Sequence, residues 1–169
     1  MTTGYHNVVV GNDAAGTMTE GHNNTVVGTE ALKLNTTGSA NVAIGAKALC
    51  TATTSSSNVA VGRESMKLTT TGTKNVAVGT NSLDANTTAS NNVAIGFDSM
   101  TTNTTGCRNT AIGESTLRLN TTGLCNVSVG AFSLEQNTTG CYNVAVGALA
   151  LNRNTTATKN TAVGHQALD

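Results

Sequence analysis

The residues that could carry chemistry are few and are not grouped along the chain. The candidates for metal binding or nucleophilic catalysis are His6, His22, His165, Cys50, Cys107, Cys125 and Cys141. No two of the cysteines have the C-x-x-C spacing typical of zinc sites and redox pairs. His6 and His22 are the one pair that could share a metal ion, although two exposed polar side chains are the favoured interpretation. No phosphate-binding loop, catalytic triad or Asp-rich calcium repeat is present, so we expect no enzyme activity, no cofactor and no metal.

The charge balance excludes several classes of partner. The chain has 169 residues, with 9 Lys and Arg against 9 Asp and Glu. Proteins that bind nucleic acid or anionic membranes carry clustered basic residues, so neither partner is expected. No stretch approaches the roughly 18 apolar residues that span a bilayer, and residues 1–20 do not resemble a signal peptide. Only 11% of residues are charged, whereas about 25% is usual for a globular domain.

A repeat of seventeen residues organises the whole chain. Its fixed point is a glycine, found at Gly11, Gly28, Gly45, Gly62, Gly79, Gly96, Gly113, Gly130, Gly147 and Gly164. An asparagine precedes each glycine by four residues, at Asn7, Asn24, Asn41, Asn58, Asn75, Asn92, Asn109, Asn126, Asn143 and Asn160. Such strict self-similarity without insertions is the signature of a repeat architecture. Residues 1–169 are therefore expected to form one domain.

The local pattern indicates strands rather than helices. Residues 41–45 read Asn-Val-Ala-Ile-Gly, in which large and small side chains alternate as in a pleated strand. Seventeen residues are too few for a helical-hairpin repeat or a propeller blade. The sequence therefore predicts an all-β fold, a parallel β-solenoid of ten seventeen-residue coils stacked about 4.8 Å apart.

Stacking turns each repeat position into a column along the rod. The glycine column (Gly45, Gly62, Gly79, Gly96 and Gly113 in the central coils) is expected at a corner that needs positive φ or close backbone approach. The asparagine column (Asn41, Asn58, Asn75, Asn92 and Asn109 there) is expected to form a hydrogen-bonded ladder at a corner. A ligand-binding role for ten identical asparagines is the less favoured interpretation.

The core is predicted from the alternation within each strand. We expect the Val and Ile positions to point inward, the alanine between them outward, and a leucine column to join the Val/Ile pair inside. The core residues predicted in this way include Val42, Ile44, Leu49, Val93, Ile95, Leu117 and Leu134.

Sixteen of the 18 charged residues fall in four columns, which identifies the surface that faces water. Uncharged surfaces are expected at the outward alanine column and at a pair of threonine columns, to which Thr36 and Thr37 belong. A coil with about three sizeable apolar side chains gains little from burial, so we expect subunit contacts through uncharged faces.

Two kinds of covalent modification are considered. Cys125 lies one column from Cys107 and Cys141 and could form a disulfide with either, although free, partly buried thiols are favoured. Asparagine sequons occur at Asn23, Asn35, Asn86, Asn103, Asn120, Asn126, Asn137 and Asn154. Because the Asn-Thr-Thr motif forms the turn itself, its presence says little about glycosylation.

The repeat resembles two related groups of fibrous proteins. The Asn-Val-Ala-Ile-Gly runs at 41–45 and 92–96 are similar to the head repeats of trimeric autotransporter adhesins, and residues 28–38 resemble repeats of phage and bacterial tail-fibre-type proteins. The resemblance covers essentially the whole chain. It implies a left-handed β-roll and a homotrimer of three chains packed side by side, exposed outside the cell on a virion or cell surface.

The expected function is therefore structural. The chain is interpreted as a shaft segment of a tail fibre or adhesin, serving in attachment or as a rigid spacer, with a host-surface receptor or carbohydrate as possible partner. One alternative is a filament subunit that stacks head to tail, because 169 residues is one short of ten periods. Another is an ice-binding protein that uses its threonine ladder, although adjacent threonines in a strand face opposite ways.

Overall fold

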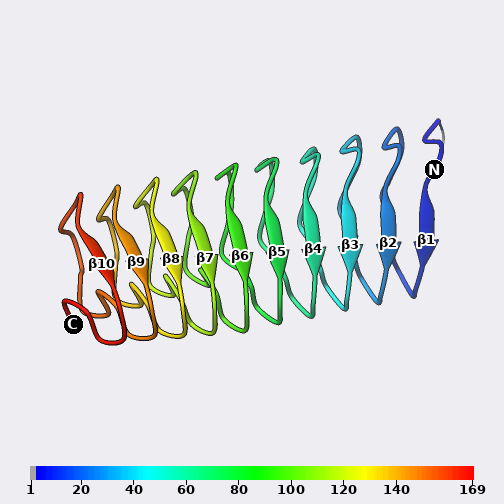
Figure 1. Ribbon diagram of the computed structural model, residues 1–169. Helices are drawn as coiled ribbons and strands as arrows, with labels where there is room; N and C mark the ends of the chain where they lie inside the picture. The colour runs from blue at the N-terminus through cyan, green and yellow to red at the C-terminus, as the bar shows by residue number, and fades with distance from the viewer. Residues whose placement is uncertain (1–2) are drawn as a thin grey trace.

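The computed structural model describes residues 3–169 as a stack of coils, each contributing one short strand to a single parallel sheet (Figure 1). The ten strands are β1 (Val8–Val10), β2 (Thr25–Val27), β3 (Val42–Ile44), β4 (Val59–Val61), β5 (Val76–Val78), β6 (Val93–Ile95), β7 (Thr110–Ile112), β8 (Val127–Val129), β9 (Val144–Val146) and β10 (Thr161–Val163). They pair in sequence order from β1 to β10. The prediction of an all-β parallel solenoid with a spacing of seventeen residues is confirmed.

The register places each residue on its equivalent in the next coil. Val42 pairs with Val59, and Ile44 pairs with Val61, an offset of seventeen residues that recurs at every junction. Figure 1 shows the strands side by side as rungs, with the chain ends at opposite ends of the rod and the strands tilting progressively from β1 to β10. Parallel pairing in this register converts the sequence repeat directly into columns along the rod.

The strand ends at the repeat glycine because the chain turns there in a conformation that other residues rarely adopt. Gly113 has a φ of +139°, and the other nine repeat glycines have φ between +126° and +139°. The corner of each coil also packs closely against the corner of the next. A Cβ added to Gly113 would lie 2.7 Å from the carbonyl carbon and oxygen of Gly130. Both reasons for a glycine therefore apply at this corner.

Three further columns hold non-glycine residues at positive φ. They lie two, four and twelve residues after the repeat glycine, as at Lys47 (φ 61°), Leu49 (φ 50°) and Ser57 (φ 60°). A left-handed residue reverses the direction of its backbone groups. The Lys47 N–H accordingly donates to Thr29 of the preceding coil (2.9 Å), whereas the Leu49 N–H donates to Ser65 of the following coil (3.0 Å). Hydrogen bonds to both neighbours offset the roughly 1–2 kcal/mol that each left-handed residue costs.

The prediction that Val42, Ile44, Val93 and Ile95 lie in the core is wrong. Ile44 and Ile95 are each 37% exposed and the two valines are half-buried, whereas the alanine between each pair is fully buried. The asparagine column explains this reversal. Asn41 points inward and is buried, so strict alternation puts the next residue outside and the alanine after it inside.

The leucine column fills the interior as predicted. Leu49, Leu117 and Leu134 are fully buried, and methionine replaces leucine in two of the coils. The fully buried members of this column are Leu32, Leu49, Met66, Leu83, Met100, Leu117 and Leu134. With one large side chain per coil in the interior, the strand presents a small residue inward in most coils, and β2 presents Val26.

The asparagine column forms a continuous ladder of amides inside the rod. The Asn75 backbone N–H donates to the Asn58 Oδ1 (2.9 Å), and the Asn75 Oδ1 accepts the Asn92 N–H (3.0 Å). The Asn75 Nδ2 also donates to the Ala89 carbonyl (2.9 Å), which closes the turn before the next strand. The Asn75 amide thus accepts a backbone N–H of the following coil, donates to a carbonyl of the turn before the next strand, and donates to the asparagine side chain of the preceding coil.

A second amide ladder occupies the Asn-Thr-Thr-Gly turn, where sequence inspection had found only a turn motif. Asn120 donates to Asn103 (2.7 Å), and Asn137 donates to Asn120 (2.9 Å). Five of these sequon asparagines (Asn35, Asn86, Asn103, Asn120 and Asn137) are fully buried. A glycan could not be attached to them in the folded rod.

Candidate functional surfaces

The candidate functional features are surfaces that run along the rod. Residues 3–169 contain no pocket, and among them no three His, Cys, Asp or Glu side chains are grouped so that they could hold a metal ion. The described part of the chain also has no helix that is long and apolar enough to cross a membrane. Function is therefore sought in the columns of outward-facing side chains.

The two N-terminal histidines lie in an aromatic cluster. The Tyr5 ring stacks on the His22 ring with centroids 4.9 Å apart, and it meets the His6 ring edge-on at 5.0 Å. The His22 Nδ1 is 3.1 Å from the Ser39 hydroxyl. His165 lies at the other end of the rod, in the last coil, and is exposed.

All four cysteines are free and half-buried, as the favoured interpretation predicted. The Cys107 Sγ accepts the Ser90 N–H, and the Cys141 Sγ accepts the Leu124 N–H, both at 3.4 Å. Burial raises the pKa of the Cys50 thiol.

The most extensive uncharged surface is the outer face of the sheet, which we call the apolar strip. It consists of the first and third residues of every strand: Val8, Val10, Thr25, Val27, Val42, Ile44, Val59, Val61, Val76, Val78, Val93, Ile95, Thr110, Ile112, Val127, Val129, Val144, Val146, Thr161 and Val163. The strip is about 43 Å long and about 10 Å wide, or roughly 400 Å². Contiguous exposed apolar patches of about this size are often functional.

The threonine columns are used differently from each other. The Thr36 hydroxyl donates to the Thr53 carbonyl (3.1 Å), and the Thr53 hydroxyl donates to the Thr70 carbonyl (3.3 Å), so the first column is tied into the stack. The second column, to which Thr37 and Thr105 belong, is exposed. The turn thus presents one row of exposed threonines to solvent.

Ion pairs gather on one edge of the rod. Lys33 bridges Asp13 and Glu30, each at 2.8 Å, and Arg118 pairs with Glu135 at 2.8 Å. The hydrogen bond and charge of Lys33 hold the pKa of Glu30 below its ordinary value. Such surface pairs contribute little to stability. The columns one, two and five residues after the repeat glycine hold eight carboxylates and five basic residues, so this edge keeps an excess of negative charge.

Asp84 is the exception on the charged edge. One of its carboxylate oxygens is buried without a hydrogen-bond partner, and burial raises the pKa of this carboxyl. The positive charge of Lys67 opposes the rise, whereas Glu64 and Asp98 reinforce it. Ionised Asp84 is therefore an unfavourable feature of the folded rod at neutral pH.

We expect Asp84→Asn to raise stability by up to about 1 kcal/mol at pH 7, because the amide removes a partly desolvated charge. A raised folded-state pKa means that the wild-type protein binds this proton more tightly when folded. The loss of stability that ionised Asp84 causes in the wild-type protein therefore develops as pH rises through that pKa, and it vanishes at lower pH. Urea unfolding of both proteins between pH 3 and 7 should show the two stabilities converging on acidification.

Glu64→Gln is the matched control, with the opposite sign. A hydrogen bond from Lys67 lowers the pKa of Glu64, so its stabilising contribution is present at neutral pH and is lost as pH falls. The glutamine variant should be less stable than wild type at pH 7 and equal to it in acid. An Asp84→Asn advantage that persists unchanged at pH 3 would contradict the assignment.

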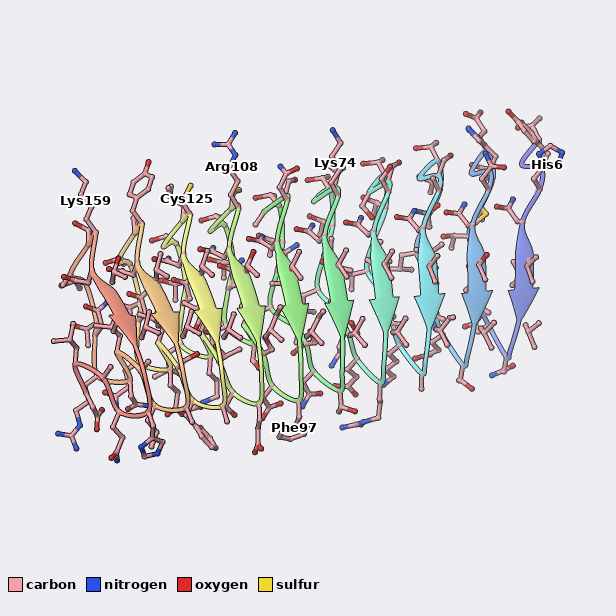
Figure 2. The ribbon with its side chains drawn as sticks, in the orientation of Figure 1. His6, Lys74, Phe97, Arg108, Cys125 and Lys159 are labelled. Atoms are coloured by element: carbon pink, nitrogen blue, oxygen red, sulfur yellow. The ribbon has the colours of Figure 1, made fainter. Side chains whose placement is uncertain are left out.

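The opposite edge carries cations without carboxylates. Lys74, Arg108 and Lys159 occupy one column, twelve residues after the repeat glycine, and all three are exposed. Figure 2 shows them projecting along the same edge, away from Phe97, which lies on the other side of the rod. The rod thus has an ion-paired edge, an apolar strip and a cationic edge.

Comparisons with protein-family models, with curated proteins and with solved structures find no match. The ion-paired edge, the apolar strip and the cationic edge are the candidate functional surfaces of the rod. Among them, sequence inspection had identified the charged columns but had assigned the residues of the apolar strip to the core. The signal that could have corrected this is the polar asparagine directly before each strand, which fixes which residues of the strand point inward.

Proposed function

We propose that the chain is a structural shaft segment in which rods associate side by side, as a homotrimer, through the apolar strip. The observation that carries this proposal is the strip itself, a flat uncharged surface formed by equivalent side chains of all ten strands. The proposed setting is a virion tail fibre or a cell-surface adhesin, where such a rod serves in attachment or as a rigid spacer.

The interior of the coil supports the need for partners. Most coils bury one Leu or Met, one small strand residue and amide side chains. Most of the other large aliphatic side chains lie on the outer face of the sheet, and the rest, such as Leu34 and Leu68, lie in the connecting segments. A Val or Ile moved from exposure to full burial contributes about 1.5–3 kcal/mol, and each side chain of the strip is only partly buried in a single rod. Association through the strip would complete the burial that the narrow coil leaves unfinished.

Symmetry favours a closed assembly over an open one at this surface. Three parallel rods with their strips facing a common axis bring Ile95 of each chain to the same level, and every other strip residue likewise. A closed ring of identical contacts buries the apolar strip of every subunit and leaves none exposed. The ion-paired and cationic edges remain outside such a core.

We expect Ile95→Lys to convert a trimer into a monomer. Ile95 lies in β6, at mid-length of the strip, so three lysines would meet where no carboxylate of the strip can pair with them. Multi-angle light scattering should give three times the 17.0 kDa chain mass for wild type and a single chain mass for the variant.

Thr105→Lys is the control, because it adds the same charge at an exposed position on the threonine turn. It should remain trimeric. A wild-type monomer, or equal masses for the two variants, would overturn the proposal. Long filaments in electron micrographs of the same sample would favour head-to-tail stacking instead, and thermal hysteresis would favour ice binding.

A further inference from the structure

The cationic edge is defined by six consecutive coils of the rod. Its residues, each twelve after a repeat glycine, are Lys74, Asn91, Arg108, Cys125, Tyr142 and Lys159. We propose that this edge binds a linear anionic polysaccharide lying along the rod. The inference does not depend on self-association, because the edge lies beside the apolar strip rather than on it (Figure 2).

The distribution of ion pairs sets this edge apart. Six of the nine basic residues pair with carboxylates: Lys33, Lys47, Arg63, Lys67, Arg118 and Arg153. Among residues 3–169, the three basic residues that form no ion pair are Lys74, Arg108 and Lys159, and all of them belong to the cationic edge. Eight of the nine carboxylates lie in the columns one, two and five residues after the repeat glycine, and the ninth is Glu20. An anion approaching the cationic edge therefore meets positive charge with few competing carboxylates.

The backbone holds these side chains at fixed intervals. Lys74, Arg108 and Lys159 have φ of 59°, 58° and 62°, so they leave the rod in the same direction. Each backbone N–H donates to a carbonyl of the preceding coil, at 3.3, 3.3 and 3.0 Å. At about 4.8 Å per coil, the three cations are spaced by roughly 10 and 14 Å along their column. A linear polymer with anionic groups at intervals can meet all three without the protein rearranging.

The residues between the cations suit a sugar. Tyr142 is 55% exposed and stands between Arg108 and Lys159 in the column, and an exposed aromatic ring is a group on which a pyranose can stack. Asn91 is also exposed, and it offers an amide between Lys74 and Arg108. The exposed threonine row, to which Thr105 belongs, lies three residues before this column and adds hydroxyl groups.

A nucleic acid fits this edge less well. Single-stranded nucleic acid is usually held by a row of aromatic side chains on which successive bases stack, and the six-residue edge contains one. Three cations over about 24 Å also give a charge density well below that of a nucleic-acid groove. Intermittent anionic groups, as on a sulfated or uronic-acid polysaccharide, match the spacing better.

The test compares two triple variants of equal net charge on immobilised heparin. K74Q/R108Q/K159Q removes the cations of the proposed edge, and K47Q/R63Q/R153Q removes three exposed cations from the ion-paired edge. We expect wild type and the second variant to be retained at low salt, and the first variant to bind at least tenfold more weakly. The logarithm of the wild-type association constant should fall with the logarithm of salt concentration with a slope of about −2, as three released counterions predict.

Tyr142→Ala separates sugar stacking from simple charge attraction. It should weaken heparin binding by about three- to tenfold without changing the salt slope, because no charge is lost. Titrations with alginate, neutral dextran and oligo-dT complete the test: alginate should bind, and dextran should not. Equal losses in the two triple variants, no retention of wild type, or tighter binding of oligo-dT than of heparin would each overturn the proposal.

Discussion

Gly113→Ala is expected to destabilise the folded rod by about 4 kcal/mol or more. Two independent penalties add at this position. The φ of +139° is a conformation that residues with a Cβ rarely adopt, which costs on the order of 1–3 kcal/mol. The new Cβ would also lie 2.7 Å from the backbone of Gly130 and 3.0 Å from the Ala131 nitrogen, far inside van der Waals contact.

The neighbouring coil cannot yield to this methyl group without breaking the sheet. The Gly130 N–H donates to the Ile112 carbonyl at 2.8 Å, so a shift of Gly130 away from residue 113 lengthens a hydrogen bond that joins the two coils. Glycines stack on glycines throughout this column, so the displacement is passed on to the next coil. We expect hydrogen exchange to show loss of protection at β7 and β8 before the ends of the rod are affected.

Gly164→Ala is the matched control. Its φ of +130° imposes the same conformational penalty, but the nearest atom to an added Cβ is 3.9 Å away, at Ala167. This variant should lose only about 1–3 kcal/mol in urea unfolding, the cost of strain alone. If Gly113→Ala proved no more damaging than Gly164→Ala, the close packing of coil on coil would not be what requires glycine.

The spacing of the glycines predicted the fold because a solenoid is nearly one-dimensional. Once Gly45 and Gly62 must occupy equivalent corners, the seventeen-residue register of every strand follows. The alternation of inward and outward side chains within a strand was also predicted, but which residues point inward was not. Val-Ala-Ile fits a core of large residues as readily as a core of small ones, and the choice depends on Leu49 from the opposite wall already filling the interior.

The left-handed positions were not predictable from residue type. Lys47 and Leu49 are ordinary residues with no preference for positive φ, yet both adopt it in the stack, where the Lys47 N–H donates to the preceding coil and the Leu49 N–H donates to the following one. The same conformation aims the column of Lys74 outward, so the cationic edge is a property of the stack rather than of any local motif. The sequence places Lys74, Arg108 and Lys159 in one column, but the structure is needed to show that these three basic residues form no ion pair within residues 3–169.

Asn75→Ala is expected to cost about 3–5 kcal/mol, because it breaks the inner ladder at mid-length. The Asn75 side chain is fully buried and makes three hydrogen bonds, as donor to Asn58 and Ala89 and as acceptor from the Asn92 N–H. Its removal leaves the Asn92 N–H inside the rod without a partner, and it leaves the Ala89 carbonyl with only the longer hydrogen bond from the Asn86 Nδ2 (3.4 Å). Each such buried polar group costs on the order of 1–3 kcal/mol, and the cavity left by the amide adds to this.

Asn91→Ala tests whether the loss belongs to the ladder or to asparagine in general. Asn91 is exposed in the adjacent coil, and Ala40 occupies the same repeat position with a similar φ, so this change should cost less than about 1 kcal/mol. Asn75→Asp adds a second discrimination. The carboxylate of this variant still accepts the Asn92 N–H, but in place of the amide donor it presents an oxygen to the Asn58 Oδ1 and the Ala89 carbonyl. This repulsion raises the folded-state pKa of the carboxyl. The stability of the variant should therefore recover as pH falls, because the added proton restores one donor. If Asn75→Asp were as stable as wild type at pH 7, the amide donors would not be what holds successive coils together.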